Sequence, residues 1–139
     1  MTFSAKENSA LGAKISEVGP LKNLRTVVAD DDYGCRRSMR ELLQPFVEQP
    51  IEVSDGNKAL EMFRAHAPDL MILDASMPQL SGVDVLRHVR NSARSLTPVI
   101  LTGGRNRTER LEAVAAGATE FFEKPLDPPL FVAKIQQVL

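Results

Sequence analysis

The chain has 139 residues, 43% of them hydrophobic, and its 17 basic residues almost balance 18 acidic ones. This length accommodates one hydrophobic core, and we expect no second sizeable domain such as a DNA-binding or catalytic module. The balanced charge argues against direct nucleic-acid binding, and the single cysteine, Cys35, excludes an internal disulfide and a cysteine-rich metal site. No segment has the pattern of a membrane span or a signal peptide, so we expect a cytoplasmic protein without membrane contact.

Residues 1–23 differ in character from the rest of the chain, because polar and small residues dominate them. Leu11, Ile15 and Val18 have the spacing of one face of a short amphipathic helix, which would dock on a partner or on another copy of the chain and form a homodimer. The alternative is a flexible tail. We expect a flexible N-terminal extension over 1–23 and one folded domain over 24–139.

Beyond this extension, continuous apolar runs alternate with segments whose apolar residues recur at helical spacing. Such runs indicate strands buried on both faces, as in a parallel sheet. The expected strands are 24–29, 51–54, 69–73, 98–102 and 119–122. The expected helices are 33–44, 56–66, 82–91, 106–116 and 127–138, the fourth with apolar residues at Leu111, Val114 and Ala115. This alternation predicts an α/β fold with a parallel sheet.

Four of these apolar runs end abruptly in polar residues suited to phosphate and metal. The first runs into Asp30, Asp31 and Asp32, and the others end at Asp74, at Thr102 and at the segment containing Lys124. In an open α/β sheet the ligand site lies outside the carboxyl ends of the strands. The sequence therefore predicts one site built from carboxylates, a hydroxyl and an ammonium.

Carboxylates crowded at one sheet edge repel each other unless a cation lies between them. A hard divalent ion with oxygen ligands, Mg²⁺ or Mn²⁺, suits such a cluster. An aspartate beside the ion can act as a nucleophile toward phosphorus and form an acyl phosphate. Lys124 and Thr102 would add positive charge and a hydroxyl donor near the phosphoryl oxygens. These parts together indicate phosphoryl transfer.

From about Leu24 to Leu139 the chain resembles a receiver domain of the bacterial response regulators. The motifs that carry the resemblance are Val27-Val28-Ala29-Asp30-Asp31, Leu73-Asp74 with Met77-Pro78 and Gly82, Pro98-Val99-Ile100-Leu101-Thr102-Gly103, Ala116-Gly117-Ala118, and Lys124-Pro125. The resemblance implies a flavodoxin-like, doubly wound (βα)5 fold with a five-stranded parallel sheet in the order 2-1-3-4-5. It also implies a signalling protein that catalyses only its own phosphorylation and dephosphorylation.

The resemblance assigns a role to each residue of the predicted site. Asp74 is the phosphoacceptor and Lys124 a catalytic cation. Asp31 and Asp74 are metal ligands, Asp30 binds the metal through water, and the backbone carbonyl of Ser76 completes the protein's share of the metal shell. The expected phosphodonor is a sensor histidine kinase or a histidine phosphotransfer protein.

The run of three aspartates leaves two registers open. Aligning the apolar residue before the run, and the basic residue Arg36 after it, with the family's pattern selects Asp30 and Asp31 as the acidic pair. A slip by one residue would instead select Asp31 and Asp32.

The resemblance also implies a conformational switch. Thr102 would move toward the phosphoryl group, and Phe121 would rotate into the space that it leaves. The face formed by the last two helices and the last strand would then present the change to a downstream protein. The family further implies a cis peptide bond between Lys124 and Pro125.

Three other functions compete with this hypothesis. A receiver-like interaction module that works without phosphorylation would keep the same fold. A haloacid-dehalogenase-type phosphatase would carry a second aspartate two residues after Asp74, where this chain has Ser76. A nucleotide or flavin binder would share the fold, but neither a P-loop nor a G-x-G-x-x-G pattern is present.

Overall fold

A computed structural model describes residues 24–138 of the chain, as strands and helices in strict alternation. The strands are β1 (Thr26–Ala29), β2 (Ile51–Val53), β3 (Leu70–Asp74), β4 (Val99–Gly103) and β5 (Glu120–Glu123). The helices are α2 (Tyr33–Leu43), α3 (Gly56–His66), α4 (Gly82–Arg90), α5 (Arg107–Ala116) and α6 (Pro128–Val138). All strand pairs are parallel, and the sheet order is β2-β1-β3-β4-β5. The structure confirms the predicted five-stranded, doubly wound fold.

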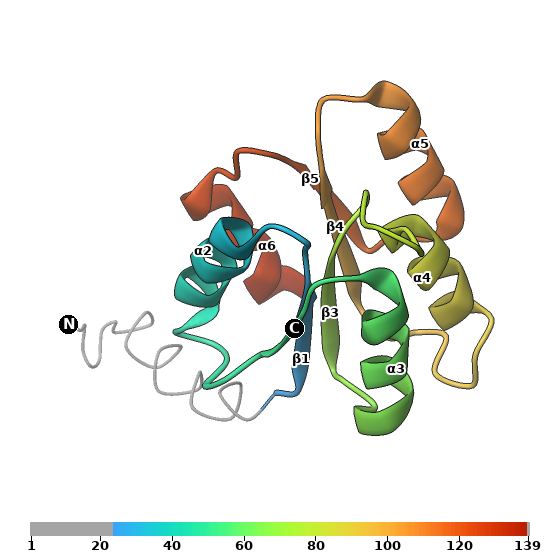
Figure 1. The fold of residues 1–139 in the computed structure, drawn as a ribbon. Helices are drawn as coiled ribbons and strands as arrows, with labels where there is room; N and C mark the ends of the chain where they lie inside the picture. Colours follow the sequence, from blue (N-terminus) through green and yellow to red (C-terminus); the bar gives the residue numbers. More distant parts are fainter. Residues whose placement is uncertain (1–23, 139) are drawn as a thin grey trace.

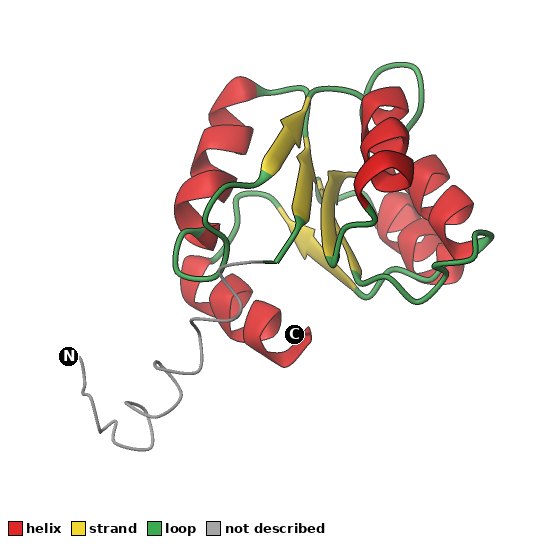
Figure 2. Ribbon diagram, turned by 90° about the horizontal axis from the view of Figure 1, so that it is seen from below, coloured by secondary structure: helices red, strands yellow, loops and turns green. Residues whose placement is uncertain are grey.

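Helices cover both faces of the sheet (Figures 1 and 2). Helices α2 and α6 lie on one face, and α3, α4 and α5 lie on the other. The core is therefore divided into two layers, and neighbouring strand residues such as Val27 and Val28 point into different layers. On the α6 side, the Phe122 ring meets the Phe131 ring edge-on, with centroids 5.1 Å apart. Burial on both faces explains why the strands lack polar alternation.

The strand register brings the predicted site residues to one edge of the sheet. Asp74 at the end of β3 lies opposite Thr102 in β4. Strands β3, β4 and β5 each end one residue later than predicted, because hydrogen bonds between neighbouring strands continue past the apolar runs. The Lys124 amide, for example, donates to the carbonyl oxygen of Gly103 at 2.7 Å. The polar end residues are thus held by the sheet itself.

Helix boundaries follow from local chemistry. The Asp32 side chain accepts hydrogen bonds from the amides of Gly34 and Cys35 and so caps the N-terminus of α2. Helix α2 ends at Leu43, close to its predicted end, because Pro45 has no backbone N–H to donate to a helical hydrogen bond. Gly117 ends α5 with a φ of 97°, in the left-handed conformation that favours glycine.

Helix α5 buries a different face from the one that its apolar spacing predicted. Leu111 and Val114 are 56% and 61% exposed, although their spacing suggested a buried face. The fully buried residue of this helix is Ala113. A small side chain allows the helix to approach its neighbours closely, and the larger apolar residues are left on the outer surface.

The expectations for the N-terminal extension concern residues outside the described range of 24–138. They include the amphipathic face suggested by Leu11, Ile15 and Val18. Within the described range, no helix has the length and apolar character needed to cross a membrane.

A substitution at Gly82 should test how closely α4 packs against the end of β3. A Cβ atom at Gly82 would lie 2.1 Å from the carbonyl oxygen of Asp74, and this oxygen belongs to the backbone and cannot rotate away. We expect Gly82→Ala to lower the free energy of unfolding by about 2 kcal/mol in urea denaturation. Helix propensity alone would favour alanine by about 1 kcal/mol, so the clash decides the sign.

Gly104→Ala is the matched control, because a Cβ atom at Gly104 would meet no atom within 4 Å. Equal stabilities of the two variants would contradict the proposed clash at Gly82.

Candidate functional site

Three carboxylates converge at the carboxyl edge of the sheet. Asp30 and Asp31 follow β1, and Asp74 ends β3; one carboxylate oxygen from each lies within 4.8 Å of the other two. Asp30 and Asp74 are buried, with 5% and 8% exposure, whereas Asp31 is exposed. Asp32 caps α2 and is not part of this cluster. The geometry thus favours the register in which Asp30 and Asp31 form the acidic pair.

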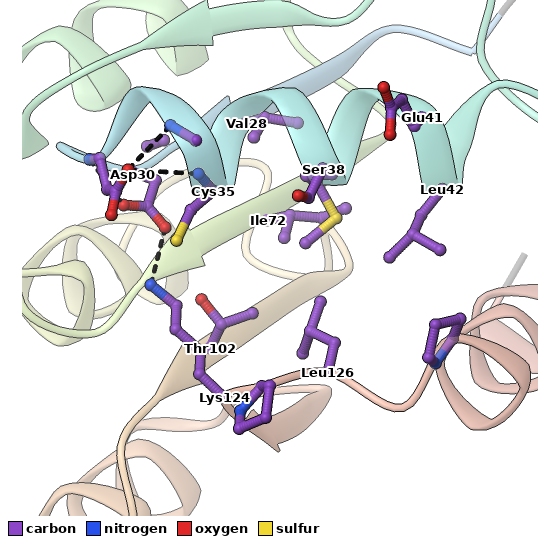
Figure 3. Close-up of a pocket in the computed structure, with 16 residues that line it drawn as sticks. Val28, Asp30, Cys35, Ser38, Glu41, Leu42, Ile72, Thr102, Lys124 and Leu126 are labelled. Atoms are coloured by element: carbon purple, nitrogen blue, oxygen red, sulfur yellow. Dashed lines mark hydrogen bonds and ion pairs between the residues drawn. The ribbon is translucent and has the colours of Figure 1, made fainter.

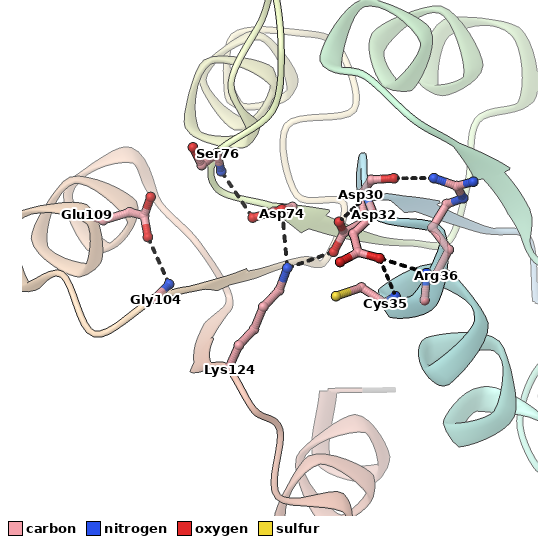
Figure 4. Close-up of polar contacts among 10 residues, drawn as sticks. Asp30, Asp32, Cys35, Arg36, Asp74, Ser76, Gly104, Glu109 and Lys124 are labelled. Carbon is pink, nitrogen blue, oxygen red and sulfur yellow. Dashed lines mark hydrogen bonds and ion pairs between the residues drawn. The ribbon is translucent and has the colours of Figure 1, made fainter.

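Lys124 bridges the two buried carboxylates (Figure 4). Its Nζ lies 2.8 Å from Oδ2 of Asp30 and 3.2 Å from Oδ2 of Asp74. One ammonium leaves three carboxylates with a net negative charge, and their oxygens are the ligands that hard cations prefer. The donor set of this cluster therefore fits a metal ion.

The pKa values of Asp74 and Lys124 are both raised, that of Asp74 by burial and that of Lys124 by its carboxylate neighbours. Burial raises the pKa of Asp74, and the Ser76 amide and Lys124 only partly oppose this effect. Burial alone would lower the pKa of Lys124, but its contacts with Asp30 and Asp74 raise the pKa above the usual lysine value. The lysine is thus held as a cation, while the buried Asp74 carboxylate is energetically costly.

Thr102 and Ser76 flank Asp74. The Ser76 amide donates to Oδ1 of Asp74 at 3.2 Å, which orients the carboxylate at the sheet edge. Thr102 is 3% exposed and lies opposite Asp74 in the strand ladder. The structure therefore brings Asp30, Asp31, Asp74, Thr102 and Lys124 to one edge of the sheet, beside the exposed Ser76, whereas the Asp32 side chain caps α2.

Phe121 is buried at 8% exposure and makes two contacts that the sequence did not suggest. The guanidinium of Arg110 lies 4.9 Å from the centre of its ring, and Arg110 also pairs with Glu123 at 3.5 Å. A Cβ atom at Gly103 would lie 2.9 Å from Cζ of the ring and closer still to Oε1 of Glu109, so a larger residue there would have to displace these side chains. The Lys124-Pro125 bond that follows β5 is cis, as expected.

A pocket of about 710 Å³ opens beside the carboxylates, between α2 and the segment that leads into α6 (Figure 3). Thr102 and Lys124 are among the residues that line it. Its apolar lining includes Val28, Met39, Leu42, Ile72 and Leu126. Cys35 also lines the pocket, and burial raises the pKa of its thiol. Cys35 is therefore a protonated pocket residue and no nucleophile at neutral pH.

Comparison with known families agrees with this geometry. The family model of the response regulator receiver domain matches residues 26–136. The chain belongs to this family. It is a receiver domain of the kind found in two-component signalling proteins, and the acidic cluster occupies the sheet edge where such a domain carries its phosphorylation site.

Related proteins support the assignment. Response regulator MprA of Mycobacterium ulcerans is 34% identical over 118 residues, which cover 84% of this chain and 50% of MprA. MprA of Mycobacterium leprae is 34% identical over 117 residues, covering 84% and 51% of the two chains. This receiver domain therefore spans about half the length of these relatives.

Solved structures show the same architecture. The signal receiver domain of NarL from Mycobacterium tuberculosis has a TM-score of 0.76 at 29% identity, covering 84% of this chain and 95% of that one. The receiver domain of Francisella response regulator 1452 has a TM-score of 0.74 at 24% identity, with 84% and 96% coverage. The second likeness concerns the fold alone.

Neutralising Asp74 should stabilise the receiver domain in metal-free buffer. At pH 7 the Asp74 carboxylate is buried beside Asp30, so we expect Asp74→Asn to raise the free energy of unfolding by about 1 kcal/mol. The pKa of Asp74 is higher in the folded than in the unfolded chain. The contribution of Asp74 to the free energy of unfolding of the wild type is therefore present at low pH, and it is lost as the pH rises through the pKa that Asp74 has in the folded chain.

The advantage of Asp74→Asn should accordingly be small near pH 3 and full at pH 7, in denaturation curves recorded with a chelator. Glu61→Gln, at a carboxylate that is 59% exposed, is the control and should change stability little. A less stable Asp74→Asn protein at pH 7 would contradict the cost assigned to the buried carboxylate.

Proposed function

We propose that this receiver domain accepts a phosphoryl group on Asp74 from a sensor histidine kinase or a histidine phosphotransfer protein. The observation that supports this most directly is the convergence of the Asp30, Asp31 and Asp74 carboxylates at one sheet edge, where the Lys124 ammonium pairs with Asp30 and Asp74. A buried carboxylate beside a fixed cation and an acidic pair has the parts that phosphoryl transfer to aspartate requires.

The proposed metal ion is Mg²⁺, with Mn²⁺ as a substitute. Asp31 and Asp74 would bind it directly, Asp30 would bind through water, and the carbonyl of Ser76 would complete the set. When bound, the ion supplies positive charge that neutralises the phosphoryl oxygens. The exposed position of Asp31 leaves its carboxylate accessible from solvent.

In the proposed transfer, an Asp74 carboxylate oxygen forms a P–O bond as the P–N bond of the donor phosphohistidine breaks. The imidazole leaves with the electron pair of that bond. Lys124 would exchange its contact with Asp74 for one with a phosphoryl oxygen, and the Thr102 hydroxyl would donate to another. Hydrolysis by water would reverse the modification. The receiver would thus catalyse only its own phosphorylation and dephosphorylation.

The proposed output surface is formed by α5, β5 and α6. Phosphorylation would draw Thr102 toward Asp74 and shift the equilibrium of Phe121 and its surroundings. The exposed Leu111 and Val114 on α5 give this surface apolar area for a protein contact. A downstream protein is the proposed partner, and a second copy of this chain is the alternative occupant of the same surface.

Phosphorylation by acetyl phosphate tests the acceptor. We expect one phosphoryl group per chain, formed only with a divalent metal ion, located on Asp74 by peptide mapping, and absent in Asp74→Asn. Asp84→Asn, at an exposed carboxylate on α4, is the control and should be modified like the wild type. Modification that persists in Asp74→Asn would refute the assignment, and an unmodified wild type would favour an interaction module that works without phosphorylation.

Thr102 and Lys124 should affect different steps. Thr102→Ala should still be phosphorylated, because a neutral donor contributes less than a full charge. Its α5-β5-α6 surface should keep the resting amide chemical shifts when beryllofluoride is added. Lys124→Ala should lose both the shifts and most of the transfer rate, because it leaves Asp30 and Asp74 without their cation.

The measurement is a pair of amide spectra, with and without beryllofluoride, for the wild type and both variants. Shifts of wild-type size across this surface in Thr102→Ala would contradict the proposed coupling, even with Asp74 confirmed as acceptor.

A further inference from the structure

Asp30 is held in place through both its backbone and its side chain. Its amide donates to the carbonyl oxygen of Val53 in β2 at 3.2 Å, and its carbonyl oxygen accepts from Nη1 of Arg36 at 2.6 Å. Its Oδ1 accepts from the Asp32 amide at 2.9 Å, and its Oδ2 accepts from Lys124. Hydrogen bonds therefore fix both the backbone and the side chain of Asp30, the residue before Asp31.

Asp31 differs from its neighbours in this respect. Within residues 24–138, its carboxylate has neither a hydrogen bond nor an ion pair, and the residue is exposed. The direction of this carboxylate depends on the backbone that carries it. That backbone begins with the peptide plane between Asp30 and Asp31, which contains the carbonyl held by Arg36.

Arg36 is itself anchored by residues of β2 and α2 (Figure 4 shows its contact with Asp30). Its Nε lies 3.8 Å from Oε1 of Glu52 in β2, and its guanidinium lies 5.6 Å from the centre of the Tyr33 ring. The Glu52 carboxylate also binds Arg40 through contacts of 2.6 and 3.2 Å. The side chain of Arg36 is only 17% exposed, so it forms a supported brace between α2 and the loop after β1.

We propose that Arg36 is a positioning residue for the metal site, holding the peptide between Asp30 and Asp31 so that the Asp31 carboxylate faces Asp74. This inference rests on the proposed metal-dependent function. Arg36 contacts neither the carboxylates of the cluster nor the phosphoacceptor, and it acts through one backbone carbonyl. Outer-shell partners of this kind typically change metal affinity by about 10- to 100-fold when removed.

Substituting Arg36 removes both a positive charge and a hydrogen bond, and these two losses should change the affinity for the metal in opposite directions. A cationic side chain near a cation site repels the metal, so removal of the charge alone would strengthen metal binding. Loss of the brace would weaken metal binding, because Asp31 would lose its fixed direction. The sign of the change therefore distinguishes positioning from electrostatics.

The experiment is a Mg²⁺ titration of the full chain, followed by amide chemical shifts and calorimetry. We expect Arg36→Met to raise the dissociation constant of Mg²⁺ about tenfold. Arg40→Met is the matched control, because Arg40 shares Glu52 but not the Asp30 carbonyl, and its dissociation constant should stay within about twofold of the wild type. Arg36→Lys keeps a hydrogen-bond donor, so its dissociation constant for Mg²⁺ should lie between those of Arg36→Met and Arg40→Met.

Phosphorylation by acetyl phosphate gives a second readout. Arg36→Met should need more Mg²⁺ for half-maximal rate and yet reach nearly the wild-type rate at saturating Mg²⁺, which a general loss of structure would not produce. Should Arg36→Met fail to fold, the Arg36→Lys titration decides the question.

Equal or tighter Mg²⁺ binding by the Arg36 variants would overturn the positioning role while leaving the proposed function intact. Asp31→Asn provides the reference for a lost ligand. A wild type that binds Mg²⁺ no better than Asp31→Asn would overturn the proposed metal site, and the role of Arg36 with it.

Discussion

The rest of the structure depends on the cost of keeping two carboxylates buried side by side. Asp30 and Asp74 lie at the same sheet edge, and a single ammonium, Lys124, holds both. Such an arrangement stays folded only when many other contacts fix its members. The parallel register, the Ser76 amide that donates to Asp74 and the Asp32 amide that donates to Asp30 supply these contacts. The negative charge that Lys124 leaves unbalanced suits this edge to a cation.

Close packing on the α3–α5 side keeps this edge rigid. The loop after β3 runs so near to α4 that Gly82 has no room for a side chain, and the Asp74 carbonyl lies against it. On the same face of the sheet, the Phe121 ring lies beside Gly103, and the guanidinium of Arg110 lies 4.9 Å from the centre of the ring. Close packing therefore surrounds both Asp74 and the aromatic residue that the proposed switch would move.

The sequence predicted the fold, and it predicted which polar residues meet at the sheet edge, because both depend on local patterns; the roles of these residues stay predictions. Continuous apolar runs marked strands covered on two faces, and the polar residues at their ends marked the edge where Asp30, Asp74 and Lys124 meet. The contacts of Arg36 and Arg110 were not predictable, since guanidinium groups reach partners that no periodicity identifies. The exposed side chains of α5 were missed for a related reason, because spacing gives an apolar face but not the side on which neighbours pack.

The place of Cys35 has a practical consequence. It is the only thiol in the sequence, and it lines the pocket that Asp30, Thr102 and Lys124 also line. A fluorophore attached there would lie beside the carboxylate cluster without any engineered cysteine. Because burial raises the pKa of the thiol, labelling would need mildly alkaline buffer. The native chain thus offers a single thiol for a reporter beside Asp30, Thr102 and Lys124.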